Sequence, residues 1–429
     1  MTATATPPAA ASAESDGPSG RELLADRLAP AVLVLYFFLN FEPLALILFI
    51  PGLFTWTVFP AAVVGVLLIT PTERISRIPI SVALVAMSVW WVASYTWSEI
   101  PLMTRSLLAS QVVPLLFLML LVGSMRPRAV VKTLLGLVVV VGVWSLAISI
   151  VLPDARAATL GPGPEGMQQG FRGTFFHKNL LGMFMVYGLC LVLPFSRTRA
   201  RPWLIALCII LVFSTRSATA GSGLMAVLFT WFWILAVDSQ KDPRERQFML
   251  VMSIVSVLVA IMLALGSMPA LLGVYQKDFT FSGRTYIWEE SMVSVARRPL
   301  QGYGLGGVWW DGRAPTTRDL HLRIGFGASH AHNGAIQMLL EVGLVGLGLF
   351  VVFVGRLVRL AVSAFGRPST SPVGQWALLT VMSLLLMSIS EPLFRGPDLG
   401  LLVVISTVLT VTWNGNRRST TPRRPVTTL

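Results

Sequence analysis

The sequence has few charged residues and almost no cysteine. Only 12% of its 429 residues are Asp, Glu, Lys or Arg, about half the share usual in soluble proteins. Hydrophobic residues make up 54% of the chain, and the mean hydropathy is +0.72. These values exclude a soluble globular enzyme and a disordered protein. The only cysteines, Cys190 and Cys208, lie inside apolar runs, which excludes a disulfide-stabilised secreted scaffold.

Several cofactor motifs are also missing. None of the four lysines follows a glycine, so the chain has no P-loop. It has no Asp-x-Asp pair, no His-Glu-x-x-His motif and no cluster of Cys and His ligands. The sequence therefore predicts chemistry without a bound metal, nucleotide or other cofactor.

The apolar runs predict an all-α polytopic membrane protein. A membrane helix needs about 20 mostly apolar residues, and that length gives about twelve transmembrane helices. They are predicted near 30–50, 52–70, 78–98, 107–125, 130–152, 177–195, 202–217, 221–237, 248–267, 333–355, 374–391 and 397–413.

Basic residues gather in alternate short connections, among them Arg74, Arg126, Arg199 and Arg356. Because short cytoplasmic loops are rich in Lys and Arg, both termini are predicted to be cytoplasmic. The predicted regions are a disordered tail at 1–28, nine spans over 29–267 with an external loop near 153–176, a large external loop with short helices at 268–332, three spans over 333–413 and a basic tail at 414–429.

The net charge is +13. Its distribution over membrane loops argues against nucleic acid as a partner and indicates contact with membrane lipid instead. Seven cations in the large external loop are not explained by topology, and they suggest an anionic ligand or, alternatively, lipid phosphates. They are Lys277, Arg284, Arg297, Arg298, Arg313, Arg318 and Arg323.

The first polar segment of the external loops runs over 170–179 and leads into a predicted span. It contains Arg172, His177 and Lys178, which are three potential cations at a helix N-terminus, where free backbone N–H groups also attract anions. The alternative is an interfacial anchor flanked by phenylalanines.

The second segment predicts a short helix that Ser282 or Gly283 caps, with Ile287, Met292 and Val295 partly sharing a face. Arg284 falls in its first turn, where a cation opposes the helix dipole. A residue placed against its local preference is a candidate for function. A Gly-rich stretch around Tyr303 follows, in which the backbone can approach a ligand closely. The alternative is an ordinary amphipathic surface helix and a turn.

The third segment is His330-Ala331-His332-Asn333-Gly334, with Glu341 two turns later. Histidine is the side chain best suited to take a proton from a hydroxyl near neutral pH, and Glu341 is a candidate orienting partner. Arg216, near the outer end of a predicted span, should face a polar cavity or extend to the headgroups. Glu391 and Arg395, at the outer end of the eleventh predicted span, belong with these candidates, and the alternative is that they simply pair with each other.

In order and spacing these segments, over about 170–350, resemble the bacterial O-antigen ligase and O-antigen polymerase superfamily, nearest to its exopolysaccharide-production polymerases. The resemblance rests on Arg172-Gly173-Thr174-Phe175 with His177-Lys178-Asn179, on Gly283-Arg284-Thr285 with Trp288, on Gly302-Tyr303-Gly304, and on His330-Ala331-His332-Asn333-Gly334 with Gln337 and Glu341. The span with Arg216 matches loosely, because the family usually has Ser directly before the basic residue and here Thr215 precedes it.

The resemblance implies a multi-pass glycosyltransferase of the bacterial cytoplasmic membrane that needs no metal or nucleotide. It would transfer a glycan from an undecaprenyl-diphosphate-linked oligosaccharide donor to a hydroxyl of a glycan or lipid-linked acceptor in the periplasm. Chain-length regulator and flippase proteins are further candidate partners. The residues expected to be essential by this resemblance are Arg216, Arg284 and one of His330 or His332.

The predicted mechanism divides these residues into a phosphate clamp and a base. Arg284 and Arg216 would hold the diphosphate, since guanidinium binds phosphate in a bidentate manner, and Arg172 and Lys178 would support them. His332, helped by His330, would be the general base. The other candidates for substrate binding are His177, Asn333, Tyr303 and Glu341.

Three alternatives stay open at this stage. Polymerisation of exopolysaccharide or O-antigen repeat units is favoured, and ligation of a finished glycan to a lipid or other acceptor is the first alternative. The second is a transporter or flippase of a lipid-linked or anionic substrate, whose pathway would include Glu42. The third is a structural membrane partner of a polysaccharide assembly complex.

Overall fold

A computed structural model describes residues 19–41, 53–151, 170–239 and 284–418, apart from 176, 197 and 394–395, and also residues 242, 245 and 249. Within these ranges the regular elements are all helices, which confirms the predicted all-α class. In chain order they are α1 (Gly20–Phe41), α2 (Leu53–Ile69), α3 (Thr72–Ile75), α4 (Val82–Ala93), η1 (Ser94–Trp97), α5 (Pro101–Leu107), η2 (Leu108–Val112), α6 (Val113–Ser124), α7 (Pro127–Val151), α8 (Lys178–Phe195), α9 (Arg201–Ser214), α10 (Ala218–Asp238), α12 (Arg284–Arg297), α13 (Pro315–Ile324), α14 (Gly334–Phe365), α15 (Ser371–Met387) and α16 (Gly396–Arg418).

The described chain contains five helices that are long and apolar enough to cross a membrane, and five shorter apolar helices accompany them. The five long ones are Pro101–Ser124, Pro127–Ile148, Lys178–Phe195, Ala218–Asp238 and Gly334–Phe365. The first of these joins α5, η2 and α6 into one helix. The predicted span at 248–267 and the predicted loop near 153–176 lie largely outside the described residues, as does Glu42. The count of twelve spans therefore stays a prediction.

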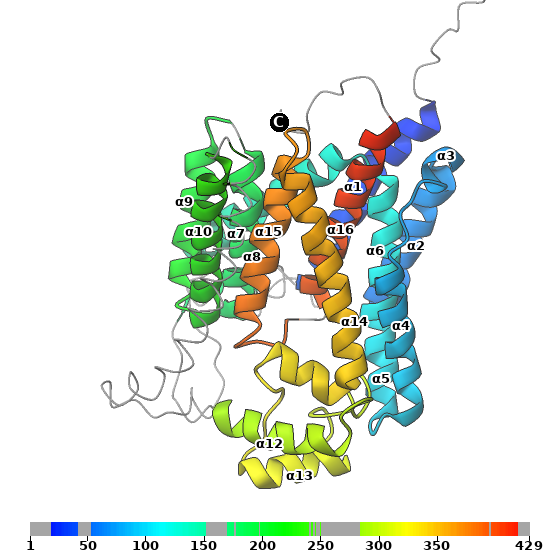
Figure 1. The fold of residues 1–429 in the computed structure, drawn as a ribbon, viewed down its shortest axis with the longest axis vertical. Helices are drawn as coiled ribbons and strands as arrows, with labels where there is room; N and C mark the ends of the chain where they lie inside the picture. Colours follow the sequence, from blue (N-terminus) through cyan, green and yellow to red (C-terminus); the bar gives the residue numbers. More distant parts are fainter. Residues whose placement is uncertain are drawn as a thin grey trace, which may run out of the picture.

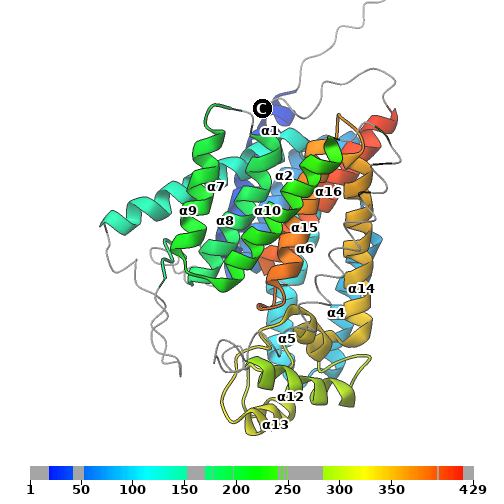
Figure 2. The same cartoon turned by 60° about the vertical axis from the view of Figure 1, so that its left-hand side comes forward.

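The long helices form a bundle, and α12 and α13 lie across one end of it, which we call the loop end (Figures 1 and 2). The chain enters at α1 and leaves at α16 at the opposite end. There Arg74 and Arg126, from two predicted cytoplasmic connections, contact Asp26 at 2.6 and 3.3 Å. These connections thus share one side, as the charge pattern predicts. α1 begins at Gly20, so residues 20–28 are helical, and the prediction of a disordered tail over all of 1–28 is wrong for this part.

Helix α14 is broken at Gly343, which has a φ of 66° and a ψ of −170°. Its first turns run across the loop end, and the remainder runs along the bundle (Figure 1). The break frees two carbonyls that find other donors. Tyr303 N–H donates to Leu340 O at 2.8 Å, and Trp90 Nε1–H donates to Val342 O at 2.9 Å. A broken helix at membrane depth is tolerated where such partners satisfy its backbone.

Helix α12 packs on the loop end through Ile287, Ser291, Ser294 and Val295, which are all buried. Of the three apolar residues predicted to share a face in part, Ile287 and Val295 are buried and Met292 is exposed. Residues three or four positions apart lie on one face of a helix, so Ser291 and Ser294, and not Met292, share the buried face with Ile287. α12, α13 and the first turns of α14 enclose a small apolar core of their own, separate from the core of the bundle. This core holds the loop segments at a fixed position under the bundle.

Candidate active site

The connection between α15 and α16 collects contacts from other helices at its residues 388–391. Gly334 N–H, at the start of α14, donates to Ser388 O at 2.7 Å. The Asn333 side chain donates to Ile389 O at 3.3 Å. Because the loop before α14 carries both histidines, these bonds tie the histidines to the end of α15.

Two further helix N-termini reach Ser390 in the same connection. Arg284, the first residue of α12, donates from its guanidinium to Ser390 O at 2.9 Å. Thr219, in the first turn of α10, lies 2.9 Å from the Ser390 hydroxyl. Asn179, in the first turn of α8, donates its amide N–H to Glu391 Oε1 at 2.9 Å. Four helix N-termini, those of α8, α10, α12 and α14, therefore meet at one point, and each adds partial positive charge there.

The two histidines lie against each other in the loop before α14. Their ring centroids are 3.9 Å apart, and His332 N–H donates to Nδ1 of His330 at 3.2 Å. His332 has a φ of 50°, in the left-handed region that few residues with a Cβ adopt. Asn333 ends the loop as the N-cap of α14, because its side-chain oxygen accepts from Ile336 N–H at 3.1 Å. The loop is thus fixed in a conformation with local strain, as is frequent at functional sites.

Glu391 is the acid closest to this pair. One ligand-type atom from each of His330, His332 and Glu391 lies within 4.8 Å of the other two. Glu391 also lies 3.8 Å from the Arg284 guanidinium. Burial raises the pKa of Glu391, while Arg284 and the hydrogen bond from Asn179 act in the opposite direction. The site therefore joins an imidazole pair, a carboxylate and a guanidinium within contact distance.

The same surroundings keep His332 neutral. Burial lowers its pKa to about 3, and the neighbouring His330 and Arg284 contribute to the shift. Its Nδ1 is buried and has no hydrogen-bond partner among the described residues. A neutral imidazole with an uncommitted nitrogen is able to accept a proton.

Three cations, Arg172, Lys178 and Arg216, lie where the start of α8 meets the end of α9. The segment before α8 packs on the end of α9, where Phe171 N–H donates to Ser214 O at 2.9 Å. This contact brings the segment containing Arg172 next to Arg216, while Lys178 opens α8 and is only 5% exposed. No described carboxylate pairs with Arg172, Lys178 or Arg216 in the structure. Lys178 is buried, Arg172 is half-buried and Arg216 is exposed. A buried cation without a counter-ion is costly, so the position of Lys178 suits an anion, and the two arginines lie close enough to share it.

His177 serves the helix rather than this group of cations. It is the N-cap of α8, and its Nδ1 accepts from Asn179 N–H at 3.1 Å. Burial, and secondly the charge of Lys178, lowers its pKa. Nδ1 is thus occupied by the cap, which leaves only Nε2 for a substrate.

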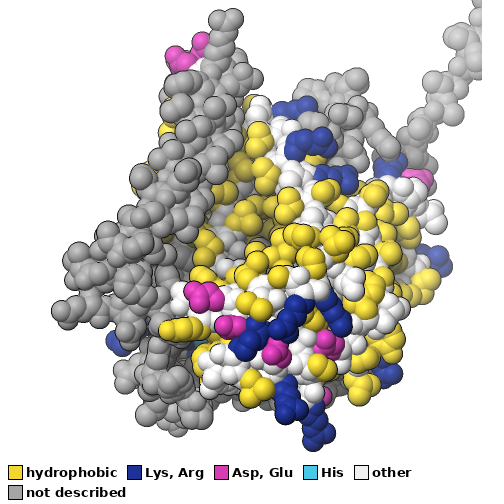
Figure 3. Space-filling model, turned by 60° about the horizontal axis from the view of Figure 1, so that its bottom comes forward, with side chains coloured by type: hydrophobic (Ala, Val, Ile, Leu, Met, Phe, Trp, Pro, Cys, Tyr) yellow, Lys and Arg dark blue, Asp and Glu magenta, His cyan; other side chains and the backbone are white. Residues whose placement is uncertain are grey.

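Most of the loop arginines are neutralised by carboxylates. Figure 3 shows charged side chains of both signs side by side on this face, surrounded by hydrophobic ones. The prediction that the large loop attracts an anion through its seven cations is therefore wrong for at least three of them, and Lys277 lies outside the described residues. The pairs are Arg297 with Asp319 at 2.6 Å, Arg323 with Glu290 at 2.6 Å and Arg298 with Glu99 at 3.7 Å.

Tyr303 and Glu341, both predicted to bind substrate, are buried, with 3% of each residue exposed. The Tyr303 hydroxyl donates to Ser294 O at 2.8 Å, and its ring lies under Arg298. Glu341 accepts from the Gln337 amide at 2.8 Å behind the histidine loop. Asn333 caps α14. The structure thus gives these three residues contacts within the protein.

The His330, His332 and Glu391 cluster is the one set of potential metal ligands in the described ranges. Two imidazoles and a carboxylate form a donor set that zinc accepts. The Arg284 guanidinium beside Glu391 opposes a second cation at this position. An acid–base set next to an anion site agrees better with this charge distribution.

The sequence left the roles of two residues of the site open. Glu391 was a candidate whose alternative was a pair with Arg395, which lies outside the described residues; in the structure Glu391 contacts Asn179 and Arg284. Asn179 was seen only as part of a motif. One feature of the sequence indicates the role of Glu391: it lies just beyond the end of a predicted span, on the same side of the membrane as His332.

The sequence model of a family described as O-Antigen ligase matches residues 202–351, a range that contains Arg216, Arg284, His330 and His332. A curated relative, the exopolysaccharide production protein ExoQ of Rhizobium meliloti (strain 1021), is 27% identical over 248 residues. This match covers 53% of the chain and 56% of the relative, so it spans little more than half of each protein.

The two matches confirm the resemblance to the O-antigen ligase and polymerase superfamily, near the exopolysaccharide production proteins. Together with the apolar helices they indicate a multi-pass membrane protein that is similar to O-antigen ligases and to an exopolysaccharide production protein. Arg172, Lys178 and Glu391 lie outside the matched family region, and only the structure connects them with it.

Proposed function

We propose that the protein is a membrane glycosyltransferase that polymerises repeat units of an exopolysaccharide or O-antigen. It takes the growing glycan from undecaprenyl diphosphate and transfers it to a sugar hydroxyl on the periplasmic face of the bacterial cytoplasmic membrane. In this orientation the loop end is periplasmic and both termini are cytoplasmic.

One observation carries the proposal: cations without carboxylate partners lie beside a neutral histidine that contacts an acid. Arg172, Lys178 and Arg216 have no described carboxylate partner, and the N-terminus of α8, which begins at Lys178, adds partial positive charge there. A bound diphosphate would supply the negative charge that these three cations lack. Asn179, next to Lys178, donates to Glu391, and a ligand-type atom of His332 lies within 4.8 Å of the Glu391 carboxylate.

In the proposed reaction the acceptor oxygen forms a bond to the anomeric carbon of the donor. The bond from that carbon to the diphosphate oxygen breaks, and the diphosphate leaves with the electron pair. The cations stabilise this developing negative charge, which is the largest single effect in many enzymes. His332 takes the proton of the acceptor hydroxyl, a step worth about 10²–10⁴-fold. Glu391 then stabilises the imidazolium.

Arg284 has two partners in this scheme. Without donor it contacts Glu391 and Ser390 O. A bound diphosphate competes for the guanidinium because the phosphate oxygens accept in a bidentate manner. Binding of the donor thus loosens the hold of Arg284 on Glu391 and brings negative charge near His332, which raises the pKa of the base for the next step.

Ligation is the second candidate, because the matching family is described as O-Antigen ligase. Both reactions use the same donor chemistry and differ in the acceptor. Purified protein in liposomes, supplied with a defined lipid-linked oligosaccharide, should form longer glycans on the carrier if it is a polymerase. If products form only when a second lipid acceptor is added, the protein is a ligase.

The same assay separates an enzyme from a transporter or a structural partner, which would form no new glycosidic bond. His332→Ala and Arg216→Ala should abolish product while the protein level stays normal. His321→Ala is the matched control, because His321 contacts Ala328 O at 2.9 Å in the loop and lies outside the site. Full activity of both site variants would refute the proposal.

A further inference from the structure

The backbone of Ala331, between the two histidines, is held at both its N–H and its carbonyl by side chains of other helices. Ala331 N–H donates to Oε1 of Gln337 at 2.8 Å. On the other side, Ala331 O accepts from Trp288 Nε1–H at 2.9 Å. Ala331 is itself fully buried. The two imidazoles on either side of this peptide therefore take their positions from groups on α12 and α14.

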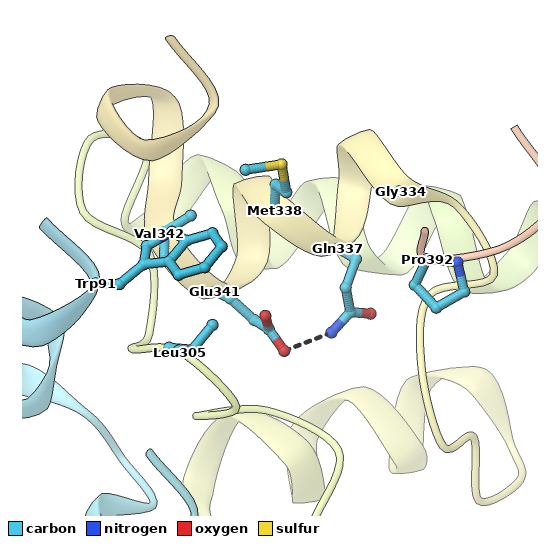
Figure 4. Close-up of a pocket in the computed structure, with 8 residues that line it drawn as sticks. All are labelled: Trp91, Leu305, Gly334, Gln337, Met338, Glu341, Val342 and Pro392. Atoms are coloured by element: carbon cyan, nitrogen blue, oxygen red, sulfur yellow. Dashed lines mark hydrogen bonds between the residues drawn. The ribbon is translucent and has the colours of Figure 1, made fainter. Parts of the chain in front are cut away.

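Glu341 fixes the direction of the Gln337 amide. Gln337 Nε2–H donates to Glu341 Oε1 at 2.8 Å, and Figure 4 shows the two side chains pointing toward each other from successive turns of α14. A carboxylate only accepts hydrogen bonds, and a backbone N–H only donates. A group between them must donate at one end and accept at the other. The amide of Gln337 meets this requirement in one orientation.

This pair lines a small cavity that extends to Gly334 and Pro392 beside the site. The cavity measures about 10 Å³, and Trp91, Leu305 and Met338 form its apolar wall. A volume of this size holds one water molecule at most, whereas a sugar ring is many times larger. Gln337 and Glu341 are both 3% exposed. Direct binding of the acceptor by Glu341 is thus incompatible with this position.

We propose that Gln337 and Glu341 are positioning residues, which set the direction of His332 through the Ala331 peptide without touching the substrate. This inference rests on the proposed function, in which His332 is the base. His332 has a positive φ, and such a conformation persists only when its surroundings fix it. Without the Gln337 amide, Ala331 N–H has lost the acceptor that holds this part of the loop in place.

The test compares kcat and KM of purified variants with the lipid-linked donor. Gln337→Met keeps the size of the side chain and removes both hydrogen bonds. Because a misplacement of about 1 Å costs about 100-fold in rate, kcat should fall by that amount while KM for the donor changes less than about twofold. Gln337→Glu should act similarly, since its carboxylate would face Glu341. Gln375→Ala is the matched control, because Gln375 also bonds a side chain four residues away, at 3.3 Å, on α15.

Rescue by a conservative change separates positioning from general stability. Glu341→Gln should retain activity within about fivefold, because its amide oxygen still accepts from Gln337, whereas Glu341→Ala should lose activity as Gln337→Met does. Equal losses for both changes at Glu341, or a donor KM that rises with the loss of kcat, would overturn the inference. Melting temperatures of all variants, measured in the same detergent, show whether a loss reflects unfolding.

A double variant distinguishes this inference from the proposed function itself. If Gln337 acts through His332, then His332→Ala combined with Gln337→Met should be no slower than His332→Ala alone. A large effect of His332→Ala with none of Gln337→Met would remove the inference and leave the proposed function intact. No effect of His332→Ala would remove the base assignment first.

Discussion

Acidification should lower kcat/KM less than it would if the catalytic base were a histidine with an ordinary pKa. Burial, aided by His330 and Arg284, lowers the pKa of His332 to about 3. A histidine with a pKa of about 6.5 would lose about 25-fold of its neutral form between pH 7 and pH 5. With a pKa of about 3 the neutral form falls by only a few per cent over that interval. The predicted change of kcat/KM is therefore less than twofold.

Donor binding should shift this behaviour in a definite direction. The parameter kcat/KM reports groups of the free enzyme, and kcat reports groups of the complex. A bound diphosphate places negative charge near His332, and nearby opposite charge favours the protonated imidazole. The acidic limb of kcat should therefore lie at higher pH than the acidic limb of kcat/KM. Arg284→Gln removes one cause of the lowered pKa of His332 and should move the acidic limb of kcat/KM to higher pH.

The assay follows product formation in proteoliposomes at donor concentrations below KM, at pH 5, 6 and 7. Glu391 needs a separate control, because burial raises its pKa and its own protonation could reduce activity on acidification. Glu391→Gln removes that titration. A fall of about 25-fold between pH 7 and pH 5, present in both the unmodified protein and Glu391→Gln, would refute the reasoning about His332.

Three further changes test the anion site, the helix break and the buried tyrosine. Lys178→Met should raise the donor KM about 10- to 100-fold, since a charged hydrogen bond is worth about 1.5–3 kcal/mol; an unchanged KM would contradict the anion site. Gly343→Ala should lower the melting temperature, because a Cβ at this φ of 66° would overlap Leu300 O; Gly348→Ala, with nothing within 4 Å, is the matched control. Tyr303→Phe should cost about 1 kcal/mol of stability through its lost buried hydrogen bond, and a raised donor KM instead would restore it as a binding residue.

The local motifs of the site could be predicted from the sequence, because polar residues stand out in an apolar chain. Arg216, Arg284, His330 and His332 were chosen on that basis. The class of the fold follows from the length of the apolar runs. Helix ends were less predictable, since α14 continues past the expected limit of 355 to Phe365 and breaks at Gly343.

Pairing between distant residues could not be predicted. Glu99 neutralises Arg298 across about two hundred positions of sequence, and Asn179 meets Glu391 over a similar interval. No local pattern carries such contacts, because they depend on how the helices pack. The sequence therefore overestimated the free positive charge of the large loop. It also assigned Tyr303 to substrate when packing uses its hydroxyl inside the loop end.

The convergence of helix N-termini on the segment after α15 has a consequence for biosynthesis. Residues 388–391 are synthesised after α8, α10, α12 and α14, yet all four helices have contacts with them. A nascent chain that has inserted its earlier spans still lacks the carboxylate that faces the imidazoles. Under the proposed function, carrier lipid that meets such a chain would find no competent site until residues 388–391 have been made and have reached these helices.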